Sequence, residues 1–239
     1  MQQYYVNYNI DENKEVIFDK EQAHHIMKVL RMKTSDVVYV VDSNANKFVV
    51  ELEVNDNVIG HIIKRHDKSS EMGIRIYLAQ GMIKGDRWDY FLQKACEFGA
   101  TDIIPLVLKR NVVKVNDGID KKLERFNKIA KEASEQSKRD ILPVVHKPMT
   151  LKELVTLEAD VKLVAYEDVA GSTALKDNLS KNINSIIFVA GSEGGFDSEE
   201  VIYLENHGYH IVGLGPRILR AESASLYFLS ALSYEKGMI

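Results

Sequence analysis

Between Gly213 and Ser225 the chain reads GLGPRILRAESAS, and this stretch decides how the fold of the whole chain is interpreted. It joins a strand-like run, HIVGL, to a helix-like run, SLYFLSALSYEK. A connection of this kind usually needs about four to six residues with simple turn chemistry. Here Gly213, Gly215 and Pro216 constrain the turn, and two arginines and a glutamate follow it. The loop therefore predicts a ligand-binding wall rather than a mere connection.

The chain around this loop, from residue 73 to the end, alternates strand-like and helix-like runs. The apolar strand-like runs are IRIYLAQ, DIIPLVL, ILPVVH, VKLVAY, SIIFVA and YHIVGL. Amphipathic runs such as DRWDYFLQKACEF and KKLERFNKIAKEASEQSK separate them. This alternation predicts a mostly parallel α/β sheet covered by helices on both faces. In such sheets ligands bind beyond the carboxyl ends of the strands, which is where the loop after HIVGL lies.

The first seventy residues have a different pattern, mostly of strands. Alternating runs such as DVVYVVD and KFVVELEV are joined by the turn residues DSNANK. One helix is predicted over residues 19–32, because Asp19 and Gln22 form a capping box ahead of an apolar face. The polar stretch HDKSSEMG marks a boundary. We therefore expect a small β-barrel domain over residues 1–70 and an α/β domain over residues 73–239.

Composition narrows the class of protein. The 239 residues are 45% hydrophobic and 28% charged, as in ordinary globular proteins, and no apolar run approaches the roughly 20 residues that span a bilayer. The N-terminus lacks the features of a signal peptide, and the single cysteine, Cys96, excludes an intrachain disulfide and a zinc cluster. His24 and His25 are adjacent rather than at metal-ligand spacing, so no metal is expected. A reducing, cytoplasmic location fits these features best.

Charge is unevenly distributed along the chain. The net charge is −4, but residues 80–150 carry fourteen Lys and Arg against ten Asp and Glu, a local net charge of +4. A basic middle in an acidic chain favours a polyanionic partner such as RNA, although a solvated helix face would have the same composition.

A second glycine-bearing stretch, AGSEGGFDSEEV, follows the run SIIFVA. Asp197 and Glu200 fit a capping box, but Gly191, Gly194 and Gly195 call for an unusual φ angle or a close backbone approach. Neither G-x-G-x-x-G nor G-x-x-x-x-G-K-[ST] is present, which disfavours a standard dinucleotide site and a P-loop. Together with the loop after HIVGL, this turn predicts a pocket with glycine walls, suited to an adenine-like ligand. From their spacing, Arg217 and Arg220 are expected to point toward one side of it.

Taken in order, these motifs resemble one family, the 16S ribosomal RNA uridine-N3 methyltransferases (the small-subunit methyltransferase E family of the SPOUT superfamily). The resemblance covers essentially the whole chain. Two departures are present: Ser192 stands where the family usually has Pro, and Ala221-Glu222-Ser223 where Thr-Glu-Thr is common. The matching blocks are HHIMKVLRM, QGMIKGDRWDYFLQKACEFGATDIIPL, KEASEQSKRDILPVV, AGSEGGFDSEEV and LGPRILRAESAS.

The resemblance implies a PUA-like RNA-binding barrel, a methyltransferase domain with a C-terminal deep trefoil knot, and a homodimer formed through the knots. It also implies transfer of a methyl group from S-adenosylmethionine to N3 of a uridine in 16S ribosomal RNA or the assembled small subunit. By similarity, the cofactor pocket is expected to include Tyr166, Glu167, Gly191, Gly194, Gly195, Leu214, Gly215, Leu219, Arg220 and Ala221.

Roles in chemistry and in RNA binding follow from the same resemblance. The imide proton must leave N3, so an arginine that stabilises charge on the base oxygens is expected, as is a proton acceptor. The candidates for catalysis are Arg220, Arg217, Arg87 and Arg139, with Glu222 as a possible base. The candidates for RNA binding are Lys28, Arg31, Lys84, Arg87, Gln136 and Arg139.

Two alternatives stay open at the level of sequence. One is another SPOUT methyltransferase that acts on transfer RNA or on ribose. The other is a non-catalytic RNA-binding assembly factor whose knot has lost the cofactor, which the intact glycines of both loops disfavour.

Overall fold

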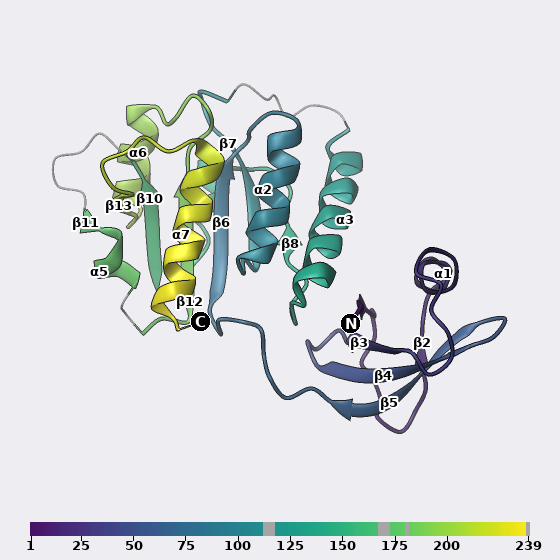
Figure 1. Cartoon of the computed structure of the whole chain (residues 1–239). Coiled ribbons are helices and arrows are strands. Elements are labelled where there is room, and N and C mark those ends of the chain that lie inside the picture. Colours follow the sequence, from purple (N-terminus) through teal and green to yellow (C-terminus); the bar gives the residue numbers. More distant parts are fainter. Residues whose placement is uncertain (112–117, 167–172, 180–181, 238–239) are drawn as a thin grey trace. The chain divides into compact units, whose positions relative to one another are not determined.

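The computed structural model describes residues 1–111, 118–166, 173–179 and 182–237 (Figure 1). The chain divides into two compact units. The first comprises Met1–Ser70 together with Ser134–Leu142, and the second comprises Glu71–Ala133 together with Pro143–Ile239. No helix among the described residues is long and apolar enough to cross a membrane.

The first unit is built on a five-stranded sheet in the order β1-β3-β4-β5-β2. Apolar residues alternate along its strands, so that Val38, Val40, Phe48, Val50 and Leu52 are buried together in one core. β1 pairs with β3 in parallel, and the other neighbours are antiparallel. The strands are β1 (Gln3–Tyr5), β2 (Val16–Ile17), β3 (Val37–Val41), β4 (Lys47–Val54) and β5 (Val58–Arg65).

The helix of this unit differs from the predicted one in its second half. The capping box of Asp19 and Gln22 is confirmed at the start of α1 (Lys20–His24). The chain then continues as a π-helical turn, η1 (His25–Val29), in which the Leu30 amide donates to the carbonyl of His25. Tyr4 Oη lies 3.0 Å from Nδ1 of His25, where the wider turn begins. The predicted helix therefore continues to Val29 and ends short of residue 32, and beyond His24 it is a π-helical turn with one extra residue rather than an α-helix.

Long-range contacts bring Ser134–Leu142 into the first unit. The side chains of Gln3 and Tyr5 both donate to the carbonyl oxygen of Arg139, at 2.7 Å each. Lys47 Nζ donates to the carbonyl of Lys138 at 2.7 Å and forms a buried ion pair with Asp140. The boundary predicted near residue 70 divides the chain by position in the sequence only. The contacts above add the segment Ser134–Leu142 to the first unit, which a single boundary cannot describe.

The second unit contains a parallel sheet in the order β11-β13-β10-β12-β6-β7-β8, with β9 beside β7. The described pairs in this sheet are all parallel, which confirms the α/β class predicted from the alternation of runs. Its strands are β6 (Arg75–Gly81), β7 (Asp102–Val107), β8 (Val144–Val145), β9 (Met149–Thr150), β10 (Val161–Ala165), β11 (Thr173–Ala174), β12 (Ser185–Ala190) and β13 (His210–Gly213).

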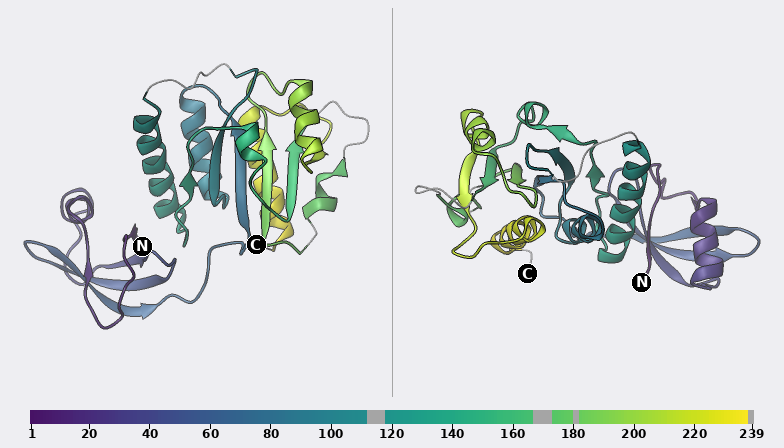
Figure 2. Two further views of the ribbon diagram at one scale, coloured as in Figure 1. Left: turned by 180° about the vertical axis from the view of Figure 1, so that it is seen from behind. Right: turned by 90° about the horizontal axis from the view of Figure 1, so that it is seen from above.

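Helices cover both faces of this sheet (Figures 1 and 2). Alternate strand residues divide between two cores: Leu78 and Phe188 pack with α2, α3, α5 and α7, and Ala79 and Val189 with α4 and α6. The helices are α2 (Asp86–Glu97), α3 (Ile119–Ser137), α4 (Leu151–Leu154), α5 (Leu175–Leu179), α6 (Ser198–Asn206) and α7 (Ala221–Glu235). The sheet is therefore a central layer, and its strand ends are left for loops.

A network of charged side chains lies at the amino-terminal ends of β6 and β7. Arg75 donates to both carboxylate oxygens of buried Asp102 at 3.0 and 3.1 Å, and His146 Nε2 lies 2.8 Å away. Burial alone would raise the pKa of Asp102, but hydrogen bonds from His146, Arg75 and Thr101 outweigh it and lower the pKa to about 2. A lowered carboxyl pKa contributes stability above the unfolded pKa, and that stability is lost as the pH falls toward the folded value.

We therefore expect Asp102→Asn to lower the free energy of unfolding by roughly 2 kcal/mol at pH 7. Below about pH 4 the difference between Asp102→Asn and the parent should shrink, because the parent carboxylate is then protonated as it unfolds. Denaturant unfolding at pH 7 and at pH 3 measures both values. The exposed Glu205→Gln, which removes the same charge, should change stability by less than about 0.5 kcal/mol. A loss that is equal at both pH values would contradict the linkage.

Candidate functional site

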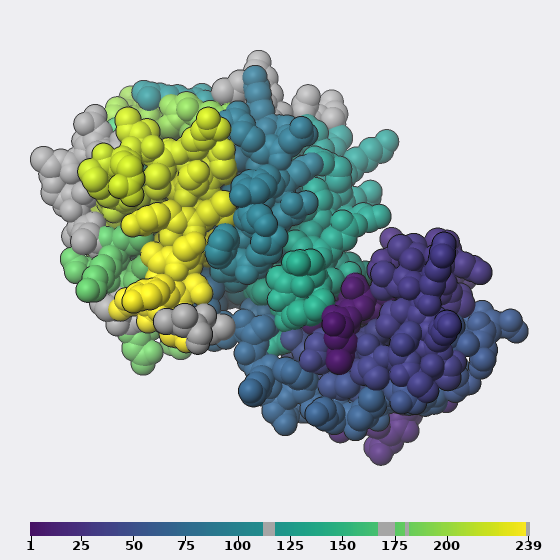
Figure 3. All heavy atoms as spheres, in the orientation of Figure 1, coloured from purple at the N-terminus to yellow at the C-terminus, as the bar shows by residue number. Residues whose placement is uncertain are grey.

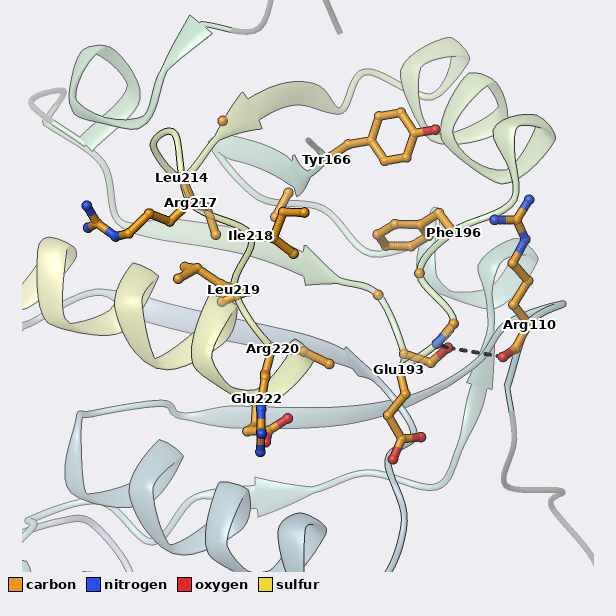
Figure 4. A pocket seen from close by; sticks show the side chains of 18 of the residues that line it. Arg110, Tyr166, Glu193, Phe196, Leu214, Arg217, Ile218, Leu219, Arg220 and Glu222 are labelled. Atoms are coloured by element: carbon orange, nitrogen blue, oxygen red, sulfur yellow. Dashed lines mark hydrogen bonds between the residues drawn. The ribbon is translucent and has the colours of Figure 1, made fainter. Parts of the chain in front are cut away.

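The carboxyl ends of three neighbouring strands form one pocket. β10 lies between β12 and β13, so the residues that follow these strands meet at one edge of the sheet (Figure 4). Tyr166 follows β10, the turn Gly191–Phe196 follows β12, and the loop Leu214–Arg220 follows β13. The cavity has a volume of about 750 Å³. That is the size of a site for a small molecule or cofactor.

The glycine turn needs its glycines for the two reasons expected from the sequence. Gly195 has a φ of +68°, and its amide donates to the carbonyl of Ser192 at 2.9 Å to close the turn. A Cβ on Gly194 would lie 2.8 Å from the carbonyl oxygen of Arg110. One glycine therefore supplies a left-handed backbone and another a close backbone approach, and the turn can face the pocket with main-chain groups.

A buried hydrogen-bond relay supports this turn from beneath. Gln80, at the end of β6, is completely buried, and its Nε2 donates to the carbonyl of Gly191 at 2.7 Å. Ser225 Oγ of α7 donates to Gln80 Oε1 at 2.7 Å. The relay connects β6, the glycine turn and α7, so it fixes two walls of the pocket at once. Neither residue was predicted from the sequence, although a Gln at the end of an apolar strand is a signal for such a role.

The second wall, Leu214–Arg220, is not helical. Gly215 has a φ of +99°, and Arg220 is the N-cap residue of α7 with an extended backbone. Figure 4 shows Arg217 and Arg220 pointing in different directions, with Arg220 beside Glu222. Residues three apart share a side only within a helix, so the sequence spacing did not carry the expectation that the two arginines point together.

Four arginines line the pocket, and they differ in their partners. Arg87 pairs with Glu193, and Arg110 pairs with Asp197 at 3.4 Å. Within the described part of the chain, no carboxylate forms an ion pair with Arg217 or Arg220. These two guanidinium groups are therefore available to an anionic ligand. Arg110 was not identified from the sequence, because only its approach to Gly194 brings it to the pocket.

Two carboxylates, Glu193 and Glu222, also line the pocket. Glu222 is 7% exposed, in the first turn of α7. Each of the two has a buried Oε2 that has no hydrogen-bond partner among the described residues. A buried carboxylate oxygen without a donor is costly, so a ligand that brings N–H or O–H groups would be favoured here. Glu193 was not predicted as a site residue, because the stretch AGSEGGFDSEEV was interpreted through its glycines and its capping box.

The predicted site residues fall into two groups. The pocket brings together most of the predicted cofactor residues and the candidates Arg87, Arg217 and Glu222, whereas Glu167 lies outside the described residues. The cofactor residues that line the pocket are Tyr166, Gly191, Gly194, Gly195, Leu214, Gly215, Leu219, Arg220 and Ala221.

The remaining candidates lie elsewhere. Lys84 is exposed beside the pocket, where its amide donates to Glu193 at 3.3 Å. Lys28, Arg31 and Gln136 are exposed in the first unit. Arg139 is only 3% exposed, so its side chain is buried, unlike those of the other RNA-binding candidates.

Two family models match the chain. Residues 70–233 match a model described as an RNA methyltransferase domain, and residues 18–58 match a model described as an RNA methyltransferase PUA domain. The matched ranges cover most of the second unit and the middle of the first. The two models therefore assign both units to proteins that methylate RNA.

Curated relatives and solved structures agree with these models. The ribosomal RNA small subunit methyltransferase E of Bacillus subtilis is 35% identical, over 100% of this chain and 98% of that protein. The protein of the same name from Mesomycoplasma hyopneumoniae is 31% identical, over 87% of this chain and 88% of that protein. A ribosomal RNA small subunit methyltransferase E from Neisseria gonorrhoeae, bound to S-adenosyl methionine, superposes with a TM-score of 0.89 at 28% identity, covering 98% of this chain and 97% of that chain.

A second solved structure also contains the cofactor. A putative methyltransferase from Legionella pneumophila, in complex with the bound cofactor SAM, has a TM-score of 0.86 at 28% identity, and the match covers 97% of this chain and 96% of that chain. Both likenesses extend over both units of the chain.

Proposed function

The chain belongs to the ribosomal RNA small subunit methyltransferase E family, and on this premise we propose that it methylates N3 of a uridine in 16S ribosomal RNA. S-adenosylmethionine is the methyl donor. The observation that carries this function is the pocket at the carboxyl ends of β10, β12 and β13, whose two walls are glycine-bearing loops. A relative with this likeness to the whole chain contains that donor.

The residues of the pocket fit this cofactor. Leu214, Leu219 and Phe196 offer apolar surface to a flat adenine ring, and the glycine turn lets the backbone approach it closely. The buried, unpartnered Oε2 of Glu222 matches a ligand that carries hydroxyl and ammonium donors. When bound, S-adenosylmethionine supplies an electrophilic methyl group on a sulfonium.

The chain's own residues then orient the base and stabilise charge. Arg220 donates to a base oxygen as negative charge develops on the uracil, and Arg217 adds positive potential at the other side of the loop. Holding the two reactants in line contributes about 7–11 kcal/mol of barrier reduction, which is the role of the rigid walls. Glu222 lies in the wall that holds the cofactor, and it is a possible proton acceptor.

RNA binding is proposed for the first unit and for the rim of the pocket. Lys28 and Arg31 lie in and just after η1, with their side chains exposed. Lys84 and Arg87 precede and begin α2 beside the glycine turn, and Gln136 is exposed near the end of α3. The lysines and arginines among these residues neutralise phosphates, so RNA affinity should fall with salt, and Gln136 can contribute a hydrogen bond. We leave Arg139 out of this set because its side chain is buried.

We also propose a cytoplasmic homodimer whose second unit forms the interface, with a trefoil knot at its C-terminal loops. Exposed aromatic side chains support the interface: Tyr227 and Tyr234 on α7 and Tyr90 on α2 are all about half exposed or more. α7 and α2 lie side by side on one face of the second unit (Figure 3). Exposed apolar patches of this kind are typical of interfaces.

Labelled methyl transfer tests the function. We expect the protein to transfer methyl from S-adenosylmethionine to small subunits from a strain that lacks the gene, and the nucleoside formed should be N3-methyluridine. Comparison with deproteinised 16S RNA shows which form is the substrate. A labelled ribose or a transfer RNA product would favour the first alternative. Failure to bind the cofactor in calorimetry, with tight RNA binding, would favour the non-catalytic assembly factor.

A further inference from the structure

Glu193 joins the two sides of the pocket. It sits in the glycine turn after β12, among the residues assigned to the cofactor, and its Oε1 accepts from Arg87 and from the backbone amide of Lys84 at 3.3 Å. Those two residues begin the rim assigned to RNA. Figure 4 shows the Glu193 side chain extending away from the turn in the same general direction as the side chain of Arg220. Glu193 is thus placed between the cofactor side and the RNA side of the pocket.

Only one of the two carboxylate oxygens of Glu193 has hydrogen-bond donors. The two donors fix Oε1, while Oε2 is buried and has no hydrogen-bond partner among the described residues. The side chain as a whole is 19% exposed while Oε2 itself is buried, so Oε2 meets a base in the pocket when the carboxylate turns toward it. An open acceptor oxygen next to a guanidinium presents acceptor and donor groups side by side. The imide edge of uracil presents the complementary pattern, an N3–H between two carbonyl oxygens.

We propose that Glu193 recognises the imide edge of uracil. Its Oε2 accepts the hydrogen bond from N3–H and then takes the proton, while Arg87 donates to a neighbouring carbonyl oxygen of the base. The inference rests on the proposed function and adds the substrate-facing group. Cytosine presents a bare N3 acceptor where uracil has N3–H, so the same carboxylate rejects it. The pair therefore determines specificity as well as catalysis.

The proton step balances as follows. The N3–H electron pair stays on nitrogen and forms the new N3–CH₃ bond, while the proton goes to Glu193 Oε2. The C–S bond breaks and its electron pair remains on sulfur, which leaves neutral S-adenosylhomocysteine. Arg87 and Arg220 stabilise the charge that appears on the base oxygens during the transfer. Glu193 then returns the proton to water.

Glu222 is the rival acceptor, and two observations favour Glu193. No hydrogen bond that orients the Glu222 carboxylate is found among the described residues, whereas Glu193 is held by two donors. Glu222 also adjoins Leu219, Arg220 and Ala221, which are assigned to the cofactor, while Glu193 adjoins the RNA rim. A carboxylate held by two donors beside the RNA rim is better placed for proton transfer than one that no such donor orients.

The test compares Glu193→Gln with Glu222→Gln and Arg87→Ala in single-turnover methylation of reconstituted small subunits. Glutamine keeps an acceptor oxygen but takes no proton, so Glu193→Gln should lose about a hundredfold in rate, with little change in RNA affinity measured in the presence of S-adenosylhomocysteine. With 16S RNA that contains 5-fluorouridine, whose imide is more acidic, this variant should recover about tenfold or more. Arg87→Ala retains the acceptor, so its recovery with 5-fluorouridine should be clearly smaller.

Each outcome decides the question. If Glu193 merely held Arg87 in place, 5-fluorouridine would restore Glu193→Gln no more than it restores Arg87→Ala, which overturns the inference. Recovery by Glu222→Gln instead would also overturn it, and would assign the proton to Glu222. Thermal unfolding and cofactor calorimetry show whether each variant is folded, and exposed Glu199→Gln should keep the parental rate. Should the parent itself form no N3-methyluridine, the proposed function fails with it.

Discussion

Replacing Arg220 by alanine should lower the single-turnover rate of methyl transfer about a thousandfold at saturating RNA and cofactor, the upper end for loss of one preorganised donor. Arg220 lines the pocket, and within the described residues its guanidinium has no carboxylate partner. Its charge is therefore available to the uracil oxygens when N3 loses its proton. The N-cap position before α7 fixes its backbone at the edge of the pocket.

Two further variants distinguish a directional hydrogen-bond donor at Arg220 from a general effect of its positive charge. Arg220→Lys keeps the charge but loses the planar fork, and it should recover only a part of the rate. Arg217→Ala removes the same charge from the same loop, and it should cost far less because Arg217 points away from Arg220 and Glu222 (Figure 4). Calorimetry should show S-adenosylhomocysteine binding to all three. A parental rate in folded Arg220→Ala would exclude Arg220 from the chemistry.

Local sequence chemistry predicted much of this fold and the two walls of the pocket. The capping boxes of Asp19 with Gln22 and of Asp197 with Glu200 are confirmed, because each depends on residues three positions apart. The strained or crowded glycines of the turn are confirmed for the same reason, since backbone requirements are local. The resemblance placed these elements in one family, and the full-length relatives agree.

Contacts between residues that are far apart in the sequence could not be predicted from local sequence patterns. Gln3 and Arg139 are 136 residues apart, and nothing in either neighbourhood predicts that one donates to the backbone of the other. The same holds for Gln80 and Ser225, 145 residues apart, whose hydrogen bond supports the pocket. The burial of Arg139 was equally unexpected for a basic residue assigned to RNA binding and catalysis. Charge and spacing predict what a side chain can do, but its surroundings decide whether it is exposed to do it.

Gly81 carries the largest steric constraint under the pocket, and Gly81→Val should weaken cofactor binding about a thousandfold. A Cβ on Gly81 would lie 2.4 Å from the amide nitrogen of Ser192 and 2.7 Å from the carbonyl carbon of Gly191. Both atoms are backbone of the glycine turn, so they cannot rotate away as a flexible side chain would. The larger side chain must displace the turn. Overpacking costs about 1–3 kcal/mol and occasionally more, and the upper end is expected here because the clash is with backbone atoms; a cost of about 4 kcal/mol corresponds to a thousandfold in affinity.

Calorimetric titration with S-adenosylhomocysteine measures this loss, and thermal unfolding shows how far the fold is weakened. Gly81→Ala should lie between the parent and Gly81→Val, because the first added carbon already meets the turn. Gly208→Ala is the matched control: Gly208 has a φ of +83° with nothing within 4 Å of an added Cβ, so it strains the backbone without touching the pocket. That variant should lose about 1 kcal/mol of stability and keep its cofactor affinity. Valine at position 81 must displace the glycine turn. Equal cofactor affinity in Gly81→Val and the parent would therefore mean that this turn does not form a wall of the cofactor site.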